Sequence, residues 1–453
     1  MSLEGKQSES RPTVPSGNDA ADIYRTLEPM GRAGQGLLVI LLAVLAWGLW
    51  AYIYQLRHGL IVTAMRDYFC WGVYIINFVF FIGISMAGTL ISAMLRLTGT
   101  QWRGPITRLA EGITLFALLI AGPMVIIDMG RPDRFFHIFE YPRLQSPILW
   151  DVFSLLTYMA GSLLYLYLPL IPDLARLRES ERPYPSWRRW LYRKLALGWQ
   201  GTPRQWKLLK HSIAIMAVTI IPVAISIHTV TAWIFGMTLR PGWHSTIIGP
   251  DFVVGALYSG IAAVITVMAL FRRFFHLERH LTVEHFRKLG ILLLAVGLVY
   301  LYFTINGYIG SAYTTQVVER NLLSSIFQGS YAVQFWAMVT IGMVLPLILL
   351  AWPWTRTLSG IVIASLLVNV GMWLMRFIIV VPTLSAPFLP APRGVQLSYV
   401  PTWVEWSITL GGFAAFGLLY FLFAKIFPIV SVWETSKNAT AAPEAGPAPG
   451  RAS

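Results

Sequence analysis

Cysteine is almost absent from this sequence of 453 residues, whose single thiol is Cys70, inside the second apolar run of the chain. One thiol cannot build a disulfide framework, ligate an iron–sulfur cluster or supply the cysteine pair of a c-type haem attachment motif. We therefore expect this chain to hold no metal, no catalytic residue and no covalently bound cofactor. Any haem or iron–sulfur cluster that serves it would belong to partner subunits.

Charge is also scarce. Charged residues occupy 12% of the positions and apolar residues 56%, and the mean hydropathy is +0.61. A soluble chain of this length needs roughly a quarter of its residues charged to cover its surface. The composition excludes an ordinary soluble enzyme and predicts a protein whose exterior faces lipid. The first 30 residues contain no apolar run, so we expect no cleaved secretory signal.

Long apolar runs are abundant, and about ten of them can cross roughly 30 Å of hydrocarbon. They lie near residues 34–54, 69–95, 106–128, 148–171, 212–236, 251–271, 289–309, 331–352, 359–382 and 403–426. The prediction is an all-α, polytopic membrane protein with a ten-span membrane domain over residues 34–428. Residues 1–33 form an N-terminal segment, and residues 429–453, rich in Ala, Pro and Gly, should be a disordered tail.

The distribution of Lys and Arg predicts the orientation of these spans. With ten spans, 26 of the 35 cations fall on one side, eight fall in the opposite loops, and Arg376 lies within a span. By the positive-inside rule the richer side is cytoplasmic, and it includes both termini and the basic loop 173–211. This loop contains four Trp residues and predicts an interfacial helix, with binding of anionic lipid or a partner as the alternative. Because the cations do not follow one amphipathic face, nucleic-acid binding is not expected.

Few ionisable residues lie in the apolar runs, and each is a functional candidate because a charge there costs about 3 kcal/mol. The third run carries Glu111 near its cytoplasmic start and Asp128 at its outer end, about 25 Å away. Four further groups lie toward the outer ends of other runs. We predict a proton pathway formed or flanked by Glu111, Asp128, Asp151, His228, Asp251 and Arg376. The alternative is that the outer members are unrelated interfacial anchors and helix caps.

The outer groups also suit quinol chemistry. A quinol site needs a carboxylate or imidazole that accepts a hydroxyl proton, inside an apolar slot that fits the isoprenoid tail. The alternative prediction is therefore a quinone-binding site formed by Asp128, Asp151, His228 and Arg376.

Several short segments resemble the NrfD/polysulfide-reductase family of membrane subunits. They are residues 71–78, 87–93, 102–111, 130–132, 146–151, 197–201, 226–229, 240–246 and 371–373. The resemblance extends over about residues 60 to 385. It implies two four-helix bundles, built from spans two to five and six to nine, with one further helix at each end of the chain.

Within this family the sequence is most similar to the second, smaller membrane subunit of bacterial alternative complex III, a quinol:electron-acceptor oxidoreductase. The quinol-binding paralogue looks to have His, Asp and an acidic residue where this chain has Asp128, Ile234 and Met375. The resemblance therefore implies a proton-conducting or coupling subunit of the bacterial cytoplasmic membrane, not itself redox-active. The implied partners are the paralogous membrane subunit, an iron–sulfur subunit, multihaem cytochrome c subunits and lipids. Menaquinone or another quinone would bind nearby.

Two other functions stay open at this point. The chain could be the quinol-oxidising subunit of the same or a related complex, since Asp151, His228 and Arg376 match the family pattern. It could also be an independent transporter or scaffold with the same fold.

Overall fold

The computed structural model of the chain describes residues 23–435, except 181, 183, 239, 314–315 and 390–397. All regular structure in this part of the chain is helical, and ten helices are long and apolar enough to span a membrane. The prediction of an all-α polytopic membrane protein is confirmed. The spans are α2 (Arg32–His58), α3 (Val73–Leu97), α4 (Gly104–Asp128), α6 (Pro147–Tyr167) continuing into α7 (Ile171–Glu179), α9 (Pro203–Gly236), α10 (Ile248–Phe274), α11 (Val283–Tyr313), α13 (Ala332–Val339) continuing into α14 (Leu345–Ala351), α15 (Leu358–Leu384) and α16 (Trp403–Ile426).

Some helices extend well beyond their apolar runs because polar residues cap them. Helix α9 begins at Pro203, whereas the apolar run begins near residue 212. The backbone amide of Gln205 donates to the Thr202 hydroxyl (3.3 Å), and the Gln205 side chain accepts from the Thr202 amide (3.2 Å). This reciprocal capping box satisfies two amides that a helix start otherwise leaves unpaired. Helix α9 therefore begins about two turns before its apolar run.

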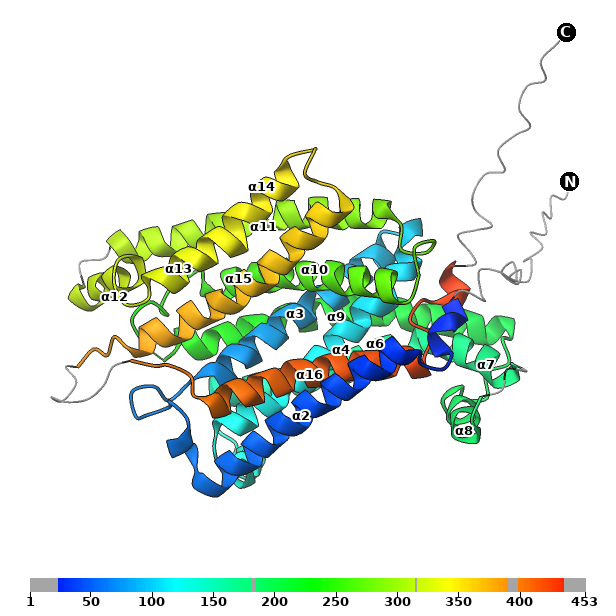
Figure 1. Cartoon of the computed structure of the whole chain (residues 1–453), viewed down its shortest axis with the longest axis horizontal. Coiled ribbons are helices and arrows are strands. Elements are labelled where there is room, and N and C mark those ends of the chain that lie inside the picture. Colours follow the sequence, from blue (N-terminus) through cyan, green and yellow to red (C-terminus); the bar gives the residue numbers. More distant parts are fainter. Residues whose placement is uncertain are drawn as a thin grey trace, which may run out of the picture.

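The spans form two adjoining four-helix bundles (Figure 1). Helices α3, α4, α6 and α9 pack together in the first bundle. Helices α10, α11, α13–α14 and α15 form the second, and contacts of α10 with α3 and α9 join the two. Helix α3 is buried along almost its whole length, so it is the central helix of the molecule. Polar groups on α3 are consequently shielded from lipid on every side.

The first and last spans, α2 and α16, run side by side along the first bundle (Figure 1). Glycines bring their backbones together, because a Cβ on Gly48 would lie only 2.8 Å from the Cα of Gly411. The Trp47 indole donates to the Ser407 hydroxyl (2.7 Å) at the same crossing. Small residues that permit close backbone approach are the usual basis of helix pairing in lipid.

A second close approach lies inside the second bundle. A short π-helical segment, η6 (Thr340–Val344), joins α13 to α14 and crosses α15 at Gly342 and Gly371. A Cβ on Gly371 would lie 2.0 Å from the Cα of Gly342, so only glycine fits. The Tyr258 hydroxyl of α10 donates to the Gly342 carbonyl (3.0 Å). The hydroxyl thus bonds a backbone carbonyl within the irregular turn.

One end of the two bundles, which we call the basic end, carries α7, α8 (Ser186–Leu195), the short turn η1 (Arg25–Leu27) and residues 427–435. Here Lys425 Nζ donates to the Glu28 carbonyl (3.2 Å) and Arg188 to the Leu27 carbonyl (3.2 Å). The start of α2 and the end of α16 therefore lie together, as an even number of spans requires. Helix α8 occupies the basic loop in which the sequence predicts an interfacial helix. The other end, which we call the opposite end, carries α12 (Val317–Phe327).

Two sequence expectations need correction. Cys70 lies before the first residue of α3 and is exposed, because the helix begins later than the apolar run does. Residues 429–435, expected to start the disordered tail, instead fold back against the basic end, where Ile429 and Val430 are fully buried. The rest of the predicted tail, and most of the N-terminal segment, lie outside the described residues.

Candidate functional site

The predicted acid at the basic end, Glu111, belongs to a buried cluster at the ends of α3 and α4. Its Oε1 accepts from the Ser92 hydroxyl (2.6 Å) and pairs with Arg96 Nη2 (3.1 Å). The other guanidinium nitrogen, Arg96 Nη1, pairs with Glu434 at 2.6 Å. One arginine thus connects an acid on a span with an acid near the end of the described chain. Glu434 was not predicted, because it lies in a segment whose composition suggested disorder.

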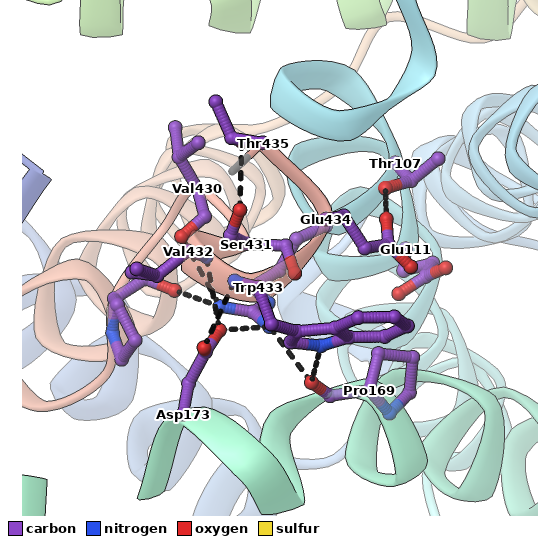
Figure 2. Close-up of polar contacts among 12 residues, drawn as sticks. Thr107, Glu111, Pro169, Asp173, Val430, Ser431, Val432, Trp433, Glu434 and Thr435 are labelled. Atoms are coloured by element: carbon purple, nitrogen blue, oxygen red, sulfur yellow. Dashed lines mark hydrogen bonds and ion pairs between the residues drawn. The ribbon is translucent and has the colours of Figure 1, made fainter. Parts of the chain in front are cut away.

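A second buried ion pair lies beside this cluster (Figure 2). Arg108 of α4 pairs with Asp173 of α7 at 2.8 Å, and both side chains are almost completely buried. Asp173 also accepts from the backbone amides of Val432 (3.2 Å) and Trp433 (3.4 Å). This pair therefore anchors the C-terminal segment to the helix ends.

A series of buried polar groups continues from Glu111 and Ser92 along α3 toward the membrane interior, and we call this series the polar file. Thr89 donates to the Thr114 hydroxyl (3.0 Å), which donates to the Ser85 carbonyl (2.7 Å). The Tyr158 hydroxyl donates to the same carbonyl (3.1 Å). All four side chains are buried. Successive levels are one helical turn apart, about 5 Å, which is short enough for one water molecule to connect them.

The next level of the polar file is His228 on α9. Its Nε2 lies 3.0 Å from the Ile82 carbonyl, and its Nδ1 lies 2.7 Å from the Ala224 carbonyl. Both ring nitrogens therefore face acceptors, although a neutral imidazole has only one N–H to donate. The imidazole can satisfy both carbonyls only when it carries a second proton. This arrangement suits a group that takes up and releases protons.

Arg376 of α15 packs against the turn of α3 that His228 also contacts. A Cβ built on Gly83 would be 3.6 Å from Arg376 Nη2, and one on Gly255 of α10 would be 3.4 Å away. The guanidinium also lies 5.1 Å from the centre of the Phe252 ring. Its Nη1 has no hydrogen-bond partner among the described residues, although the side chain is only 2% exposed. Buried guanidinium groups are rarely left in this state, which marks the position as a functional candidate.

The remaining three predicted residues lie at different places near the opposite end. Asp251 is in the first turn of α10, one turn before Gly255, and interacts electrostatically with Arg376. Asp151 accepts from the Thr231 hydroxyl (2.6 Å), one turn after His228 on α9. Asp128 is separate, beside the backbone amide of Gly72. The structure thus gathers four of the six residues around α3, α9 and α10, and leaves Asp128 and Glu111 at the two ends of α4.

A cavity of about 110 Å³ opens beside Asp251 in the second bundle. Its walls are mainly apolar, and it has a second acid, Glu319 of α12, which the sequence reasoning missed. Glu319 Oε1 accepts from the Gly242 amide (2.8 Å) and lies 3.5 Å from His244 Nε2. Glu319 is 1% exposed although it lies between two spans. The amphipathic run at 317–327 was the available signal that this stretch folds against the bundle.

The side chains in the described part of the chain offer no cluster of three or more His, Cys, Asp or Glu residues that could hold a metal ion. The buried groups instead suit hydrogen bonding and proton transfer.

Comparison with known proteins identifies the family. The family model described as polysulphide reductase, NrfD, matches residues 61–387. The chain belongs to the NrfD family. This region contains both four-helix bundles, and it agrees closely with the extent of the resemblance found in the sequence.

Three relatives match the NrfD-family chain over most of their length. A putative dimethyl sulfoxide reductase membrane subunit of Halobacterium salinarum is 30% identical, over 89% of this chain and 93% of that protein. A selenate reductase subunit of Mesobacillus selenatarsenatis is 28% identical, over 85% and 91%. The Hdr-like menaquinol oxidoreductase integral membrane subunit of Archaeoglobus fulgidus is 23% identical, over 87% and 93%.

Proposed function

We propose that this chain is a membrane subunit of a quinone-linked oxidoreductase complex, in which it conducts protons and carries no electrons itself. The polar file is the observation that supports this proposal most. It runs from Glu111 to His228 through a bundle that is otherwise apolar. Buried ionisable groups cost free energy in a membrane protein, so Glu111 and His228, joined by a series of hydroxyls, are functional candidates.

The names of the relatives support the place of this chain in a complex. Two are named as subunits of reductases and one as an integral membrane subunit of a menaquinol oxidoreductase. We propose that electrons pass through partner subunits with iron–sulfur clusters. The finer proposal, from the sequence resemblance, is alternative complex III, with a paralogous membrane subunit and multihaem cytochrome c subunits as further partners.

We propose further that the basic end faces the cytoplasm of a bacterial cell, with the chain in the cytoplasmic membrane. The support is the excess of Lys and Arg on the loops at this end and the positive-inside rule. Protons would then travel between Glu111 on the cytoplasmic side and the outer group of Asp151, His228, Asp251 and Arg376.

In this proposal each part of the route has a separate task. Glu111 exchanges a proton at its carboxylate, and the hydroxyls of Thr89, Thr114 and Tyr158 hold bridging water in line. His228 accepts a proton at the ring nitrogen that is not already donating. Arg376 stabilises an ionised carboxylate at Asp251.

The test is the number of protons moved per electron by the assembled complex in proteoliposomes. Glu111→Gln keeps the shape of the side chain and removes its titration, so the ratio should fall. The matched control is Glu284→Gln, an exposed acid that pairs with Lys288 on α11. It should leave the ratio as it is. An unchanged ratio in Glu111→Gln would mean that the route does not pass through this chain as proposed.

A second candidate function is quinol binding, which the cavity beside Asp251 favours. Its apolar walls fit a ring, and Asp251 Oδ1 has no partner among the described residues and can accept from a hydroxyl. A photoreactive quinone analogue tests this function in the whole complex. Labelling of residues 243–252 or 303–326 would support it, and labelling confined to other subunits would exclude it.

A further inference from the structure

The C-terminal segment, residues 428–435, packs against α3, α4 and α7 at the basic end (Figure 2). Arg108 donates to the carbonyls of Pro428 (2.9 Å) and Val430 (3.3 Å), and the Trp433 indole donates to the Pro169 carbonyl (3.0 Å). Together with the amide contacts to Asp173, these bonds fix the segment along its length. Its position is therefore defined by the fold and is not that of a loose tail.

The segment presents Glu434 to the interior of the first bundle. Glu434 Oε1 pairs with Arg96 Nη1 (2.6 Å), and Oε2 accepts from the Thr107 hydroxyl (3.4 Å). Arg96 Nη2 pairs at the same time with Glu111 (3.1 Å). Two carboxylates therefore share one guanidinium, and the carboxylate of the segment is directly next to the first acid of the polar file.

The charges around Glu434 determine its state. Burial raises its pKa, but Arg96, Arg103 and Arg108 lower it by more, so that the pKa lies below the usual value for glutamate. Glu434 is therefore ionised at neutral pH. Three other titratable groups lie near Glu434. They are Glu111, the buried Tyr165 hydroxyl, which lies 3.3 Å from the Ser92 hydroxyl, and Lys210, which lines the same cavity as Glu434.

A cavity of about 250 Å³ lies at this position, between the segment and helices α3 and α9. Its walls include Arg96 and Glu434 but not Glu111, and the exposed Lys210 places one wall at the surface. At about 30 Å³ for each molecule, the cavity has space for several waters. Water at the basic end can therefore reach Glu434, whereas Glu111 does not line this cavity and contacts Arg96, which does.

We propose that Glu434 is the proton-uptake residue of this chain, taking protons from water in the cavity and passing them to Glu111. The proposal rests on the proposed proton-conducting function and adds the site where protons are collected. A proton leaves a hydronium ion in the cavity and bonds to the Glu434 carboxylate, and it then moves to the Glu111 carboxylate. Arg96 pairs with whichever carboxylate is ionised, so no buried charge is left without a partner at either stage.

The test compares Glu434→Gln, Glu434→Asp and Glu111→Gln in the complete complex, reconstituted in vesicles with the basic end outward. Proton uptake per electron, followed with a pH dye outside, should fall about tenfold or more in Glu434→Gln. Glu434→Asp keeps a titratable group and should restore a substantial part of the uptake. Glu284→Gln is the control for loss of an acid at the same end of the molecule.

The outcomes separate this proposal from the proposed function. If Glu111→Gln lowers uptake and Glu434→Gln does not, Glu434 is not the uptake residue, while the route through the chain stands. If neither variant lowers uptake, the proposed function fails as well. If Glu434→Asp is as impaired as Glu434→Gln, and hydrogen exchange shows residues 428–434 released in both, Glu434 acts only as an anchor and the proposal is overturned.

Discussion

The anchor of the C-terminal segment allows a quantitative test. Asp173→Asn keeps the size of the side chain but leaves the Arg108 guanidinium buried without its counter-ion. Removing one partner of a buried ion pair typically costs about 3–5 kcal/mol. At about 1.4 kcal/mol for each factor of ten, this cost shifts the docking equilibrium of the segment by roughly a hundredfold or more. We expect the segment to leave its site more often, while the spans stay folded because lipid and helix packing hold them.

Hydrogen–deuterium exchange of the purified protein in nanodiscs measures this shift directly. The amides of Val432 and Trp433, which bond Asp173 in the native protein, should exchange about a hundredfold faster in Asp173→Asn. The double variant Arg108→Met/Asp173→Leu removes both charges and should recover most of the protection, since apolar replacements of a buried pair are often close to neutral. Asp133→Asn is the control, because Arg131 and Asp133 form an exposed pair. Unchanged exchange in Asp173→Asn, or a double variant as unprotected as the single one, would refute the reasoning.

Four further predictions concern other parts of the chain. Reporter fusions after Arg143 and after Arg182 should report opposite sides of the membrane, outer and cytoplasmic, and the same side for both would exclude ten spans. Gly371→Ala should lose about 3 kcal/mol or more from backbone overlap and lower the unfolding temperature in detergent, whereas Gly307→Ala, with open space around it, should not. Because the pKa of Glu434 is lowered in the folded chain, its stabilising contribution is present at neutral pH; exchange protection of residues 428–435 should fall only below about pH 4.3. The chain purified alone should show no haem absorbance band that survives washing.

Most of the fold could be predicted because lipid imposes a simple rule on sequence. Each span has to be apolar for about 20 residues, so the runs locate all ten helices to within a few residues in most cases. Deviations arise where polar residues extend a helix, as Thr202 and Gln205 do at the start of α9. The π-helical turn at 340–344 has no signature in hydropathy, because its geometry follows from the contact of Gly342 with Gly371.

The site was harder to predict than the fold. Acids within apolar runs, such as Glu111, are easily recognised in the sequence because a charge in an apolar environment costs free energy. Glu319 and Glu434 lie outside the runs, where an acid is ordinarily solvated, but here they are buried and have partners that include Gly242 and Arg96. Such burial depends on contacts between distant segments, which hydropathy does not record. The contacts of His228 and Arg376 with one turn of α3 also join segments that are far apart in the sequence, so hydropathy does not predict them.

The pairing of α2 with α16 has a consequence for biosynthesis. About 345 residues separate the end of α2 from the start of α16. At roughly 5–20 residues per second, a ribosome needs about 20–70 seconds to make this stretch. During that time the Gly48 face of α2 has to wait in the bilayer without its main partner. A chain that stops before Trp403 would present that face to lipid permanently.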